Sequence, residues 1–259
     1  MDVVQLWPQS PLANFNYLII RDREALIVDP FDFNLIKNEL EKRMLQVVAV
    51  INTHSHWDHV KANLDIIENY NVPVIVHANS INKIPGASIS VCAKDRFFDE
   101  GNNWVEIMET PGHTEDHICL KIIKNKKVFA VLSGDTLFNA GVGNCKNGGN
   151  PVTLYNTIST HFHRMEDEVL IYPGHDYLKN NLKFTLSIEP SNTIASQLLA
   201  EIENEKSTPY CSKILTIGEE RKINTFFRLH QLKVRQSLKM VGHSDKEVFI
   251  KLRSLRDNW

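Results

Sequence analysis

Three histidines and one aspartate fall within the six residues from His54 to His59. The cluster follows a continuous apolar run at residues 47–51, which predicts a buried strand. It precedes residues 60–70, whose apolar positions suit one face of a helix. We therefore expect the cluster on a loop at the end of a strand. Imidazole suits zinc or iron and carboxylate adds a harder ligand, whereas a polar turn with chance histidines would bury polar groups at a cost.

These four side chains cannot all reach one metal ion without strain. His54 and His56 alternate along the loop, while Asp58 and His59 are adjacent, so the two pairs point in different directions. Two neighbouring metal ions would resolve this geometry. The cluster thus predicts a binuclear centre that takes further ligands from elsewhere in the chain.

Three later segments each place a histidine or an aspartate directly after a predicted strand. They are His113 after residues 105–109, Asp135 after residues 128–132, and His175 after residues 169–172. In layered α/β folds, the loops that follow such strand ends gather at one edge of the sheet. We therefore expect these three side chains to join the cluster at residues 54–59.

The expected ligands divide into two sets of three with one carboxylate between them. The first metal ion would take His54, His56 and His113, the second would take Asp58, His59 and His175, and Asp135 would bridge the two. Room then remains for a shared water, as in catalytic zinc sites, whereas structural zinc sites are closed by four protein ligands. His117 lies four residues after His113 and is expected to be a hydrogen-bond partner rather than a ligand.

The remaining pattern predicts a layered α/β body followed by helices. Strand patterns alternate with helical ones up to Pro173 and then disappear, while residues 81–90 look irregular. Helices are expected after this point at residues 177–188, 191–205 and 245–255. The predicted organisation is a layered α/β domain at residues 1–175, which contains the ligand cluster, and a helical domain at residues 176–259.

The charge distribution bears on the possible partners. The net charge is only -2, which argues against nucleic-acid binding by the chain as a whole. Residues 213–259 carry 11 Lys and Arg against 5 Asp and Glu, whereas the rest of the chain carries 18 against 26. This basic stretch could consist of solvated helix faces, or it could receive an anionic substrate.

Cysteine spacing and hydropathy indicate a cytoplasmic protein. Cys92, Cys119, Cys145 and Cys211 show no paired spacing, so free thiols in a reducing compartment are expected. No stretch approaches ~18 uninterrupted apolar residues, and the N-terminus lacks a basic-then-apolar signal pattern. We expect no membrane span, and a monomer or small oligomer.

The ordered ligands resemble those of the metallo-β-lactamase superfamily: His54-x-His56-x-Asp58-His59, then His113, Asp135 and His175. Within it, the chain is similar to the glyoxalase II family, the hydroxyacylglutathione hydrolases. The narrower resemblance is carried by residues 172–177 with 181–184, by residues 216–228 with Phe226-Phe227-Arg228, and by residues 247–257. It therefore spans nearly the whole chain.

The resemblance implies the αββα metallo-β-lactamase sandwich with a C-terminal helical domain that holds glutathione. Tyr177 and Arg228 match the family's glutathione-contacting tyrosine and its Phe-Phe-Arg neighbourhood. The family's Cys-Gly-Arg or Cys-Gly-Lys with paired aromatics is replaced here by residues 140–151, where Lys146 supplies a basic residue. The expected substrate-binding residues are therefore Lys146, Tyr177 and Arg228, and the altered segment bears on the thiol half of the substrate.

The implied activity is hydrolysis of S-lactoylglutathione or a related acylglutathione to glutathione and a hydroxy acid, as in methylglyoxal detoxification. A water held between two divalent ions would lose a proton near neutral pH and attack the thioester carbonyl, whose developing oxyanion a metal would stabilise. The expected catalytic residues are His54, Asp58 and Asp135, with Asp58 also orienting the hydroxide. Zinc is the expected metal and iron or manganese the alternatives, because ligand types alone do not fix the metal.

Three other functions are open at this point. A persulfide dioxygenase-like protein with one iron shares the ligand motif, but the long helical C-terminus with Phe226-Phe227-Arg228 argues against it. A lactonase is conceivable if residues 145–151 reshape the pocket. A non-catalytic, metal-stabilised binding module would need a closed site, which the absence of cysteine ligands disfavours.

Overall fold

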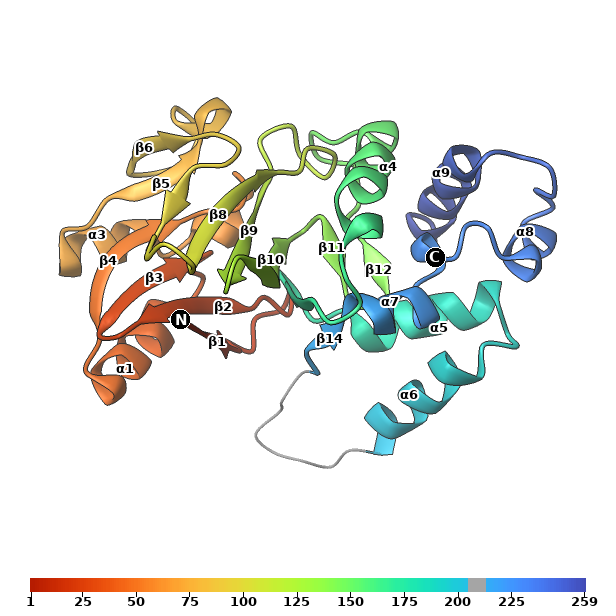
Figure 1. Ribbon diagram of the computed structural model, residues 1–259, viewed down its shortest axis with the longest axis horizontal. Coiled ribbons are helices and arrows are strands. Elements are labelled where there is room, and N and C mark those ends of the chain that lie inside the picture. The colour runs from red at the N-terminus through yellow and green to blue at the C-terminus, as the bar shows by residue number, and fades with distance from the viewer. Residues whose placement is uncertain (205–212) are drawn as a thin grey trace.

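Two six-stranded sheets pack face to face, and helices cover the outer face of each (Figure 1). The structure is a computed structural model and describes residues 1–204 and 213–259. The expected helix end at Glu205 and the expected free thiol of Cys211 lie outside these residues. The observed layers are those of the expected αββα sandwich.

The first sheet has the strand order β1-β2-β3-β4-β5-β6. Its strands are β1 (Asp2–Leu6), β2 (Asn16–Arg21), β3 (Glu24–Val28), β4 (Gln46–Ile51), β5 (Val74–His77) and β6 (Ala87–Val91). Side chains alternate between its two faces, so Ile19 and Leu26 pack between the sheets while Leu18 and Ile27 pack against α1 (Phe33–Arg43). This alternation is what the apolar runs of the sequence predict.

The expectation of an irregular segment at residues 81–90 is wrong where β6 begins. Ala87–Val91 pairs in parallel with β5 at the edge of the sheet. Ser88, Ile89 and Ser90 are all exposed, so this edge strand lacks the alternation between polar and apolar residues that marks a half-buried strand. Pairing with a neighbour, rather than a local pattern, makes it a strand.

The second sheet has the strand order β14-β13-β10-β9-β8-β7. Its strands are β7 (Arg96–Phe97), β8 (Trp104–Glu109), β9 (Ile118–Lys124), β10 (Lys127–Gly134), β13 (Leu170–Pro173) and β14 (Leu215–Thr216). A small hairpin, β11 (Leu137–Phe138) with β12 (Gly141–Val142), follows β10. The expectation that strands disappear after Pro173 is wrong, since β14 pairs antiparallel with β13; a two-residue strand is too short to show a period.

The single helix expected at residues 60–70 is instead two helices, α2 (Trp57–Val60) and α3 (Asn63–Tyr70). The amide of Ala62 donates to the carbonyl of Pro30 at 2.9 Å, outside the helix. Asn63 turns its side chain to Asn52 at 2.8 Å. These tertiary hydrogen bonds override the apolar spacing and end α2 directly after the ligand cluster.

Helices gather beside the second sheet and at the C-terminal end of the chain (Figure 1). They are α4 (Pro151–Thr160), η2 (Phe162–Arg164), α5 (Leu178–Ile188), α6 (Thr193–Asn204), α7 (Ile217–Ile223), η3 (Thr225–Phe227), α8 (Leu232–Ser237) and α9 (Asp245–Arg256); η1 (Ala78–Ser80) follows β5. One apolar cluster joins Leu154 and Ile171 to Phe226 and Phe249. Since this cluster crosses residue 175, the two-domain boundary stays a prediction.

Two further expectations concern the described residues only. Cys92, Cys119 and Cys145 are free, as predicted. Within residues 1–204 and 213–259, no helix is both long enough and apolar enough to cross a bilayer.

Candidate metal centre

Loops at four strand ends bring the expected ligands together. The ligands from β4 and its loop are His54 and His56, with Asp58 and His59 on the short helix α2; His113 follows β8, Asp135 follows β10, and His175 follows β13. Six of the seven side chains are buried, and His56 is half-buried. The structure therefore places all seven at one edge of the sandwich, as the sequence predicts.

The first set of three converges through its imidazole nitrogens. His56 Nδ1 lies 3.0 Å from His54 Nε2 and 3.0 Å from His113 Nε2. Three nitrogens facing one point at this distance form a group able to hold one metal ion.

The second set converges in the same way. His59 Nε2 and His175 Nε2 lie 3.1 Å apart, and Asp58 Oδ2 lies 3.4 Å from the latter. Asp135 lies between the sets: its Oδ1 is 3.3 Å from His175 Nε2, and its Oδ2 is 3.5 Å from His113 Nε2. A carboxylate with one oxygen toward each set is placed to bridge two ions.

The outward nitrogen of each imidazole has its own acceptor, which fixes the tautomer and turns the other nitrogen inward. The pairs are His54 Nδ1 with Thr53 Oγ1 at 2.9 Å, His56 Nε2 with Asn147 O at 3.2 Å, His59 Nδ1 with Asp29 Oδ2 at 2.8 Å, His113 Nδ1 with Asn144 O at 2.7 Å, and His175 Nδ1 with Leu12 O at 2.8 Å. These hydrogen bonds thus turn the inward nitrogen of each ring toward the other ligands of the cluster.

The electrostatics of the site favour added positive charge. Burial lowers the pKa of His59, but the carboxylates of Asp135 and Asp29 outweigh it and raise this pKa to about 10. Burial likewise raises the pKa of Asp135, yet the His175 and His59 imidazoles hold it well below its usual range. Asp135 Oδ1 is also buried without a hydrogen-bond partner. A buried carboxylate oxygen that lies among converging nitrogens and accepts no hydrogen bond fits divalent cations.

His117 is a hydrogen-bond partner of the site, as predicted. Its Nε2 accepts from the backbone amide of Asp135 at 3.0 Å. Burial, aided by the neighbouring imidazole of His113, lowers the pKa of His117 to about 3, which keeps the ring neutral. Its Nδ1 lies 2.8 Å from Thr110 Oγ1, so both ring nitrogens have partners outside the two ligand sets. It therefore holds the position of Asp135 while its ring stacks on that of His54, with centroids 5.0 Å apart.

Asp29, which the sequence pattern did not single out, orients His59 and Thr53 from the end of β3. Its Oδ2 accepts from His59 and from the Thr53 hydroxyl at 2.6 Å, and its Oδ1 accepts from the Thr53 amide at 2.7 Å. The available signal was its place after a strand that pairs in parallel with β4. Because neighbouring parallel strands end at the same edge of a sheet, an aspartate directly after β3 is expected to lie beside the cluster that follows β4.

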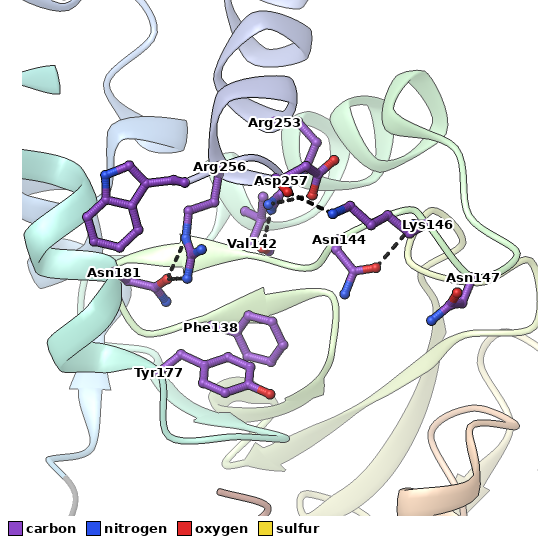
Figure 2. Close-up of a pocket in the computed structure, with 11 residues that line it drawn as sticks. Phe138, Val142, Asn144, Lys146, Asn147, Tyr177, Asn181, Arg253, Arg256 and Asp257 are labelled. Atoms are coloured by element: carbon purple, nitrogen blue, oxygen red, sulfur yellow. Dashed lines mark hydrogen bonds and ion pairs between the residues drawn. The ribbon is translucent and has the colours of Figure 1, made fainter. Parts of the chain in front are cut away.

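A cavity of about 330 Å³ lies beside the candidate metal centre. Figure 2 shows the residues that line it. Its lining comprises Phe138, Val142, Asn144, Lys146, Asn147, Tyr177, Asn181, Arg253, Arg256, Asp257 and Trp259. The ring of Tyr177 stacks on that of His175, with centroids 5.0 Å apart and planes 4° apart. The cavity and the ligand cluster therefore share a wall.

Two of the three expected substrate-binding residues line this cavity, and the third does not. Lys146 and Tyr177 are part of the lining. Arg228 is absent from it, because its Nε and Nη2 donate to the two carboxylate oxygens of Glu189, each at 2.8 Å. The cavity takes its arginines from α9 instead, Arg253 and Arg256, which the sequence reasoning did not select.

Comparisons with known proteins match the chain in two parts and as a whole. Residues 10–92 match the family model described as Metallo-beta-lactamase superfamily, and residues 176–259 match the one described as Hydroxyacylglutathione hydrolase C-terminus. The chain is 38% identical over 267 residues to a hydroxyacylglutathione hydrolase from Nitrosococcus oceani, covering 100% of both chains. A hydroxyacylglutathione hydrolase from a Polaromonas species shows the same identity and coverage.

Solved structures confirm the expected fold class. ETHE1 from Myxococcus xanthus superimposes with a TM-score of 0.65 at 22% sequence identity, covering 99% of this chain and 98% of that one. At this identity the likeness concerns the fold alone. Together with the match at residues 10–92, it confirms the metallo-β-lactamase sandwich.

Proposed function

Because the chain belongs to the hydroxyacylglutathione hydrolase family, we propose that it hydrolyses S-lactoylglutathione or a related acylglutathione to glutathione and a hydroxy acid. The observation that carries this proposal is the wall shared by the ligand cluster and the basic cavity, at Tyr177 and His175. A substrate held in the cavity by its glutathione part would extend its thioester toward the metal centre. Glyoxalase II-type hydrolysis needs this juxtaposition of binding and chemistry.

The seven side chains would hold two divalent ions, with His54, His56 and His113 for one, Asp58, His59 and His175 for the other, and Asp135 between them. When bound, such ions supply a nucleophilic hydroxide at neutral pH and polarise the carbonyl group. The chain's own part is to hold the ligands in place: Asp29 fixes the ring of His59, and His117 fixes the backbone of Asp135. We expect zinc, with iron or manganese as alternatives.

The cavity offers the groups that glutathione carboxylates need. Arg256 lines it from α9, and its Nη2 donates to Asn181 Oδ1 at a relaxed 3.2 Å, which leaves other donors for an anion. Burial raises the pKa of Tyr177, so its hydroxyl is a neutral donor. Lys146 adds a cation at the opposite side (Figure 2). We therefore propose Lys146, Tyr177 and Arg256 as the substrate-binding residues, with Arg256 in place of the expected Arg228.

The test is hydrolysis of S-lactoylglutathione, measured beside the metal content of the same purified protein. Turnover with close to two ions per chain supports the proposal. A fully metallated protein without turnover overturns the acylglutathione part. Other thioesters, lactones and glutathione persulfide form the comparison series, and preferred oxidation of the persulfide would favour the dioxygenase-like alternative.

A further inference from the structure

Two imidazoles of the first set are oriented by a single segment, residues 142–147. The carbonyl of Asn144 accepts from His113 Nδ1 at 2.7 Å, and the carbonyl of Asn147 accepts from His56 Nε2 at 3.2 Å. A ring held at its outward nitrogen keeps its inward nitrogen aimed at the metal. The conformation of this segment therefore decides how well His56 and His113 converge.

The segment is anchored to the end of helix α9 at two points (Figure 2). Arg253, which is 4% exposed, donates from Nη1 to the carbonyls of Val142 at 2.7 Å and Gly143 at 3.0 Å. Lys146 donates from Nζ to the main-chain carbonyl of Asp257 at 2.7 Å. The second anchor lies directly between the two carbonyls that hold the imidazoles.

Lys146 lies in the exposed part of the segment, where its amide also donates to Asn144 Oδ1 at 3.1 Å. Residues 146–148 are exposed, and Gly148 adopts a φ of +88°, a left-handed conformation that glycine enters without strain. The next fixed point is the Asn150 amide, which donates to the carbonyl of Gly112 at 2.8 Å. Without the bond to Asp257, the carbonyl of Asn147 would be free to move away from His56.

The second set is held by a different part of the chain. The N-terminal segment before β2 supplies the carbonyl of Leu12 to His175 Nδ1 at 2.8 Å, and Asn14 Nδ2 donates to Asp58 Oδ2 at 2.9 Å. Asn14 is buried, and Ser10 Oγ in turn donates to its side-chain oxygen at 2.7 Å. No residue of the segment 142–147 takes part in these hydrogen bonds.

We propose that Lys146 is a positioning residue that sets the metal affinity of the first set by tying residues 142–147 to α9. Asn14 has the corresponding role for the second set, so the chain tunes its two metal sites separately. The inference rests on the metal-dependent part of the proposed function and not on the substrate. Metal retention tests it independently of turnover, so a failure of acylglutathione hydrolysis would leave it standing.

The experiment compares zinc-loaded wild type with Lys146→Met and Asn14→Ala during dialysis against increasing chelator. Metal content gives the affinity, and anomalous diffraction at the zinc edge shows which set has emptied. Lys146→Met should release the ion of the first set at about three- to tenfold lower chelator concentration, the range expected for losing one partly exposed hydrogen bond. Asn14→Ala should instead release the ion of the second set first.

Two controls separate positioning from general destabilisation. Lys146→Arg keeps a charged donor and should restore retention close to wild type, while Lys179→Met removes a surface lysine paired with Glu203 and should change nothing. Equal loss from both sets in Lys146→Met would overturn the proposal. So would unchanged retention in that variant, or a matching loss in Lys179→Met.

Discussion

Arg228 and Glu189 form a bidentate ion pair in which two guanidinium nitrogens each lie 2.8 Å from a different carboxylate oxygen. The side chains are 18% and 5% exposed, so the pair is largely shielded from water. It joins the segment after η3 to the end of α5, where residues 39 positions apart meet. We therefore interpret the pair as a structural contact between these two segments, because a buried charge needs a fixed partner of opposite charge.

Arg228→Met should therefore cost stability and leave substrate binding intact. Removing the guanidinium leaves the buried carboxylate of Glu189 without its charged partner, although Asn192 Nδ2 still donates to it at 3.2 Å. We therefore expect the free energy of unfolding to fall by about 3 kcal/mol. Urea denaturation measures this loss. The double variant Arg228→Met with Glu189→Leu should recover most of it. An unchanged urea midpoint would contradict the structural role of Arg228. A raised KM in the folded variant would indicate that Arg228 binds substrate.

Arg256→Met should have the opposite signature. Arg256 lines the cavity, and a charge-assisted hydrogen bond to a substrate carboxylate contributes equally to the ground state and the transition state. We expect KM for S-lactoylglutathione to rise about tenfold with kcat nearly unchanged. Steady-state kinetics on the metal-loaded variant measures both constants. A fall in kcat at constant KM would place Arg256 in the chemical step instead.

Asp135→Ala should abolish activity while preserving the fold. Asp135 has one oxygen toward each set of ligands, so its loss removes the bridge between them. Removing a side chain that only hydrogen-bonds to a metal ligand lowers activity about 10- to 100-fold. Removing a ligand itself should therefore lower activity more than about 100-fold. Metal analysis and circular dichroism on the same sample measure occupancy and fold. Full activity in a metal-poor Asp135→Ala protein would refute the metal mechanism.

Asp29→Asn should lower metal affinity without removing any ligand. Three donors converge on the Asp29 carboxylate, and an amide in its place would turn its own N–H groups toward one of them. We expect about 10- to 100-fold weaker zinc retention, read by competition with a chelator. The matched control is Asp32→Asn, which replaces the N-cap residue of α1 by another good N-cap residue. This control should leave zinc retention unchanged. Identical retention in both variants would contradict this role.

The convergence of the candidate ligands was predictable from sequence because His54, His113, Asp135 and His175 each come soon after the end of a strand. His113, Asp135 and His175 need only the local rule that strand ends meet at one edge. The arginines that line the cavity were not predictable: whether Arg228 or Arg256 faces it depends on the packing of α9 and on Glu189, which no local pattern reveals. Strands β6 and β14 were missed for the same reason, since pairing partners define them.

Glu220 introduces a pH dependence of stability that is separate from the metal centre. Its side chain is fully buried in α7, and this burial raises its pKa to about 8 despite hydrogen bonds from the Ala140 amide and from Asn224. In the unfolded chain the pKa returns to about 4.3. Between these values the folded state keeps the proton and the unfolded state releases it. Stability therefore falls as pH rises from about 4.3 to about 8.

Glu220→Gln cannot titrate, and its amide oxygen can still accept from Ala140 and Asn224. We expect the free energy of unfolding of the wild type to fall more steeply with pH, by up to about 1.4 kcal/mol per pH unit, than that of the variant. Urea unfolding of both proteins at pH 5, 6.5 and 8, with chelator present, isolates this difference because the histidine cluster is common to both. Parallel slopes would mean that Glu220 is ionised in the folded chain, and that its hydrogen bonds outweigh its burial.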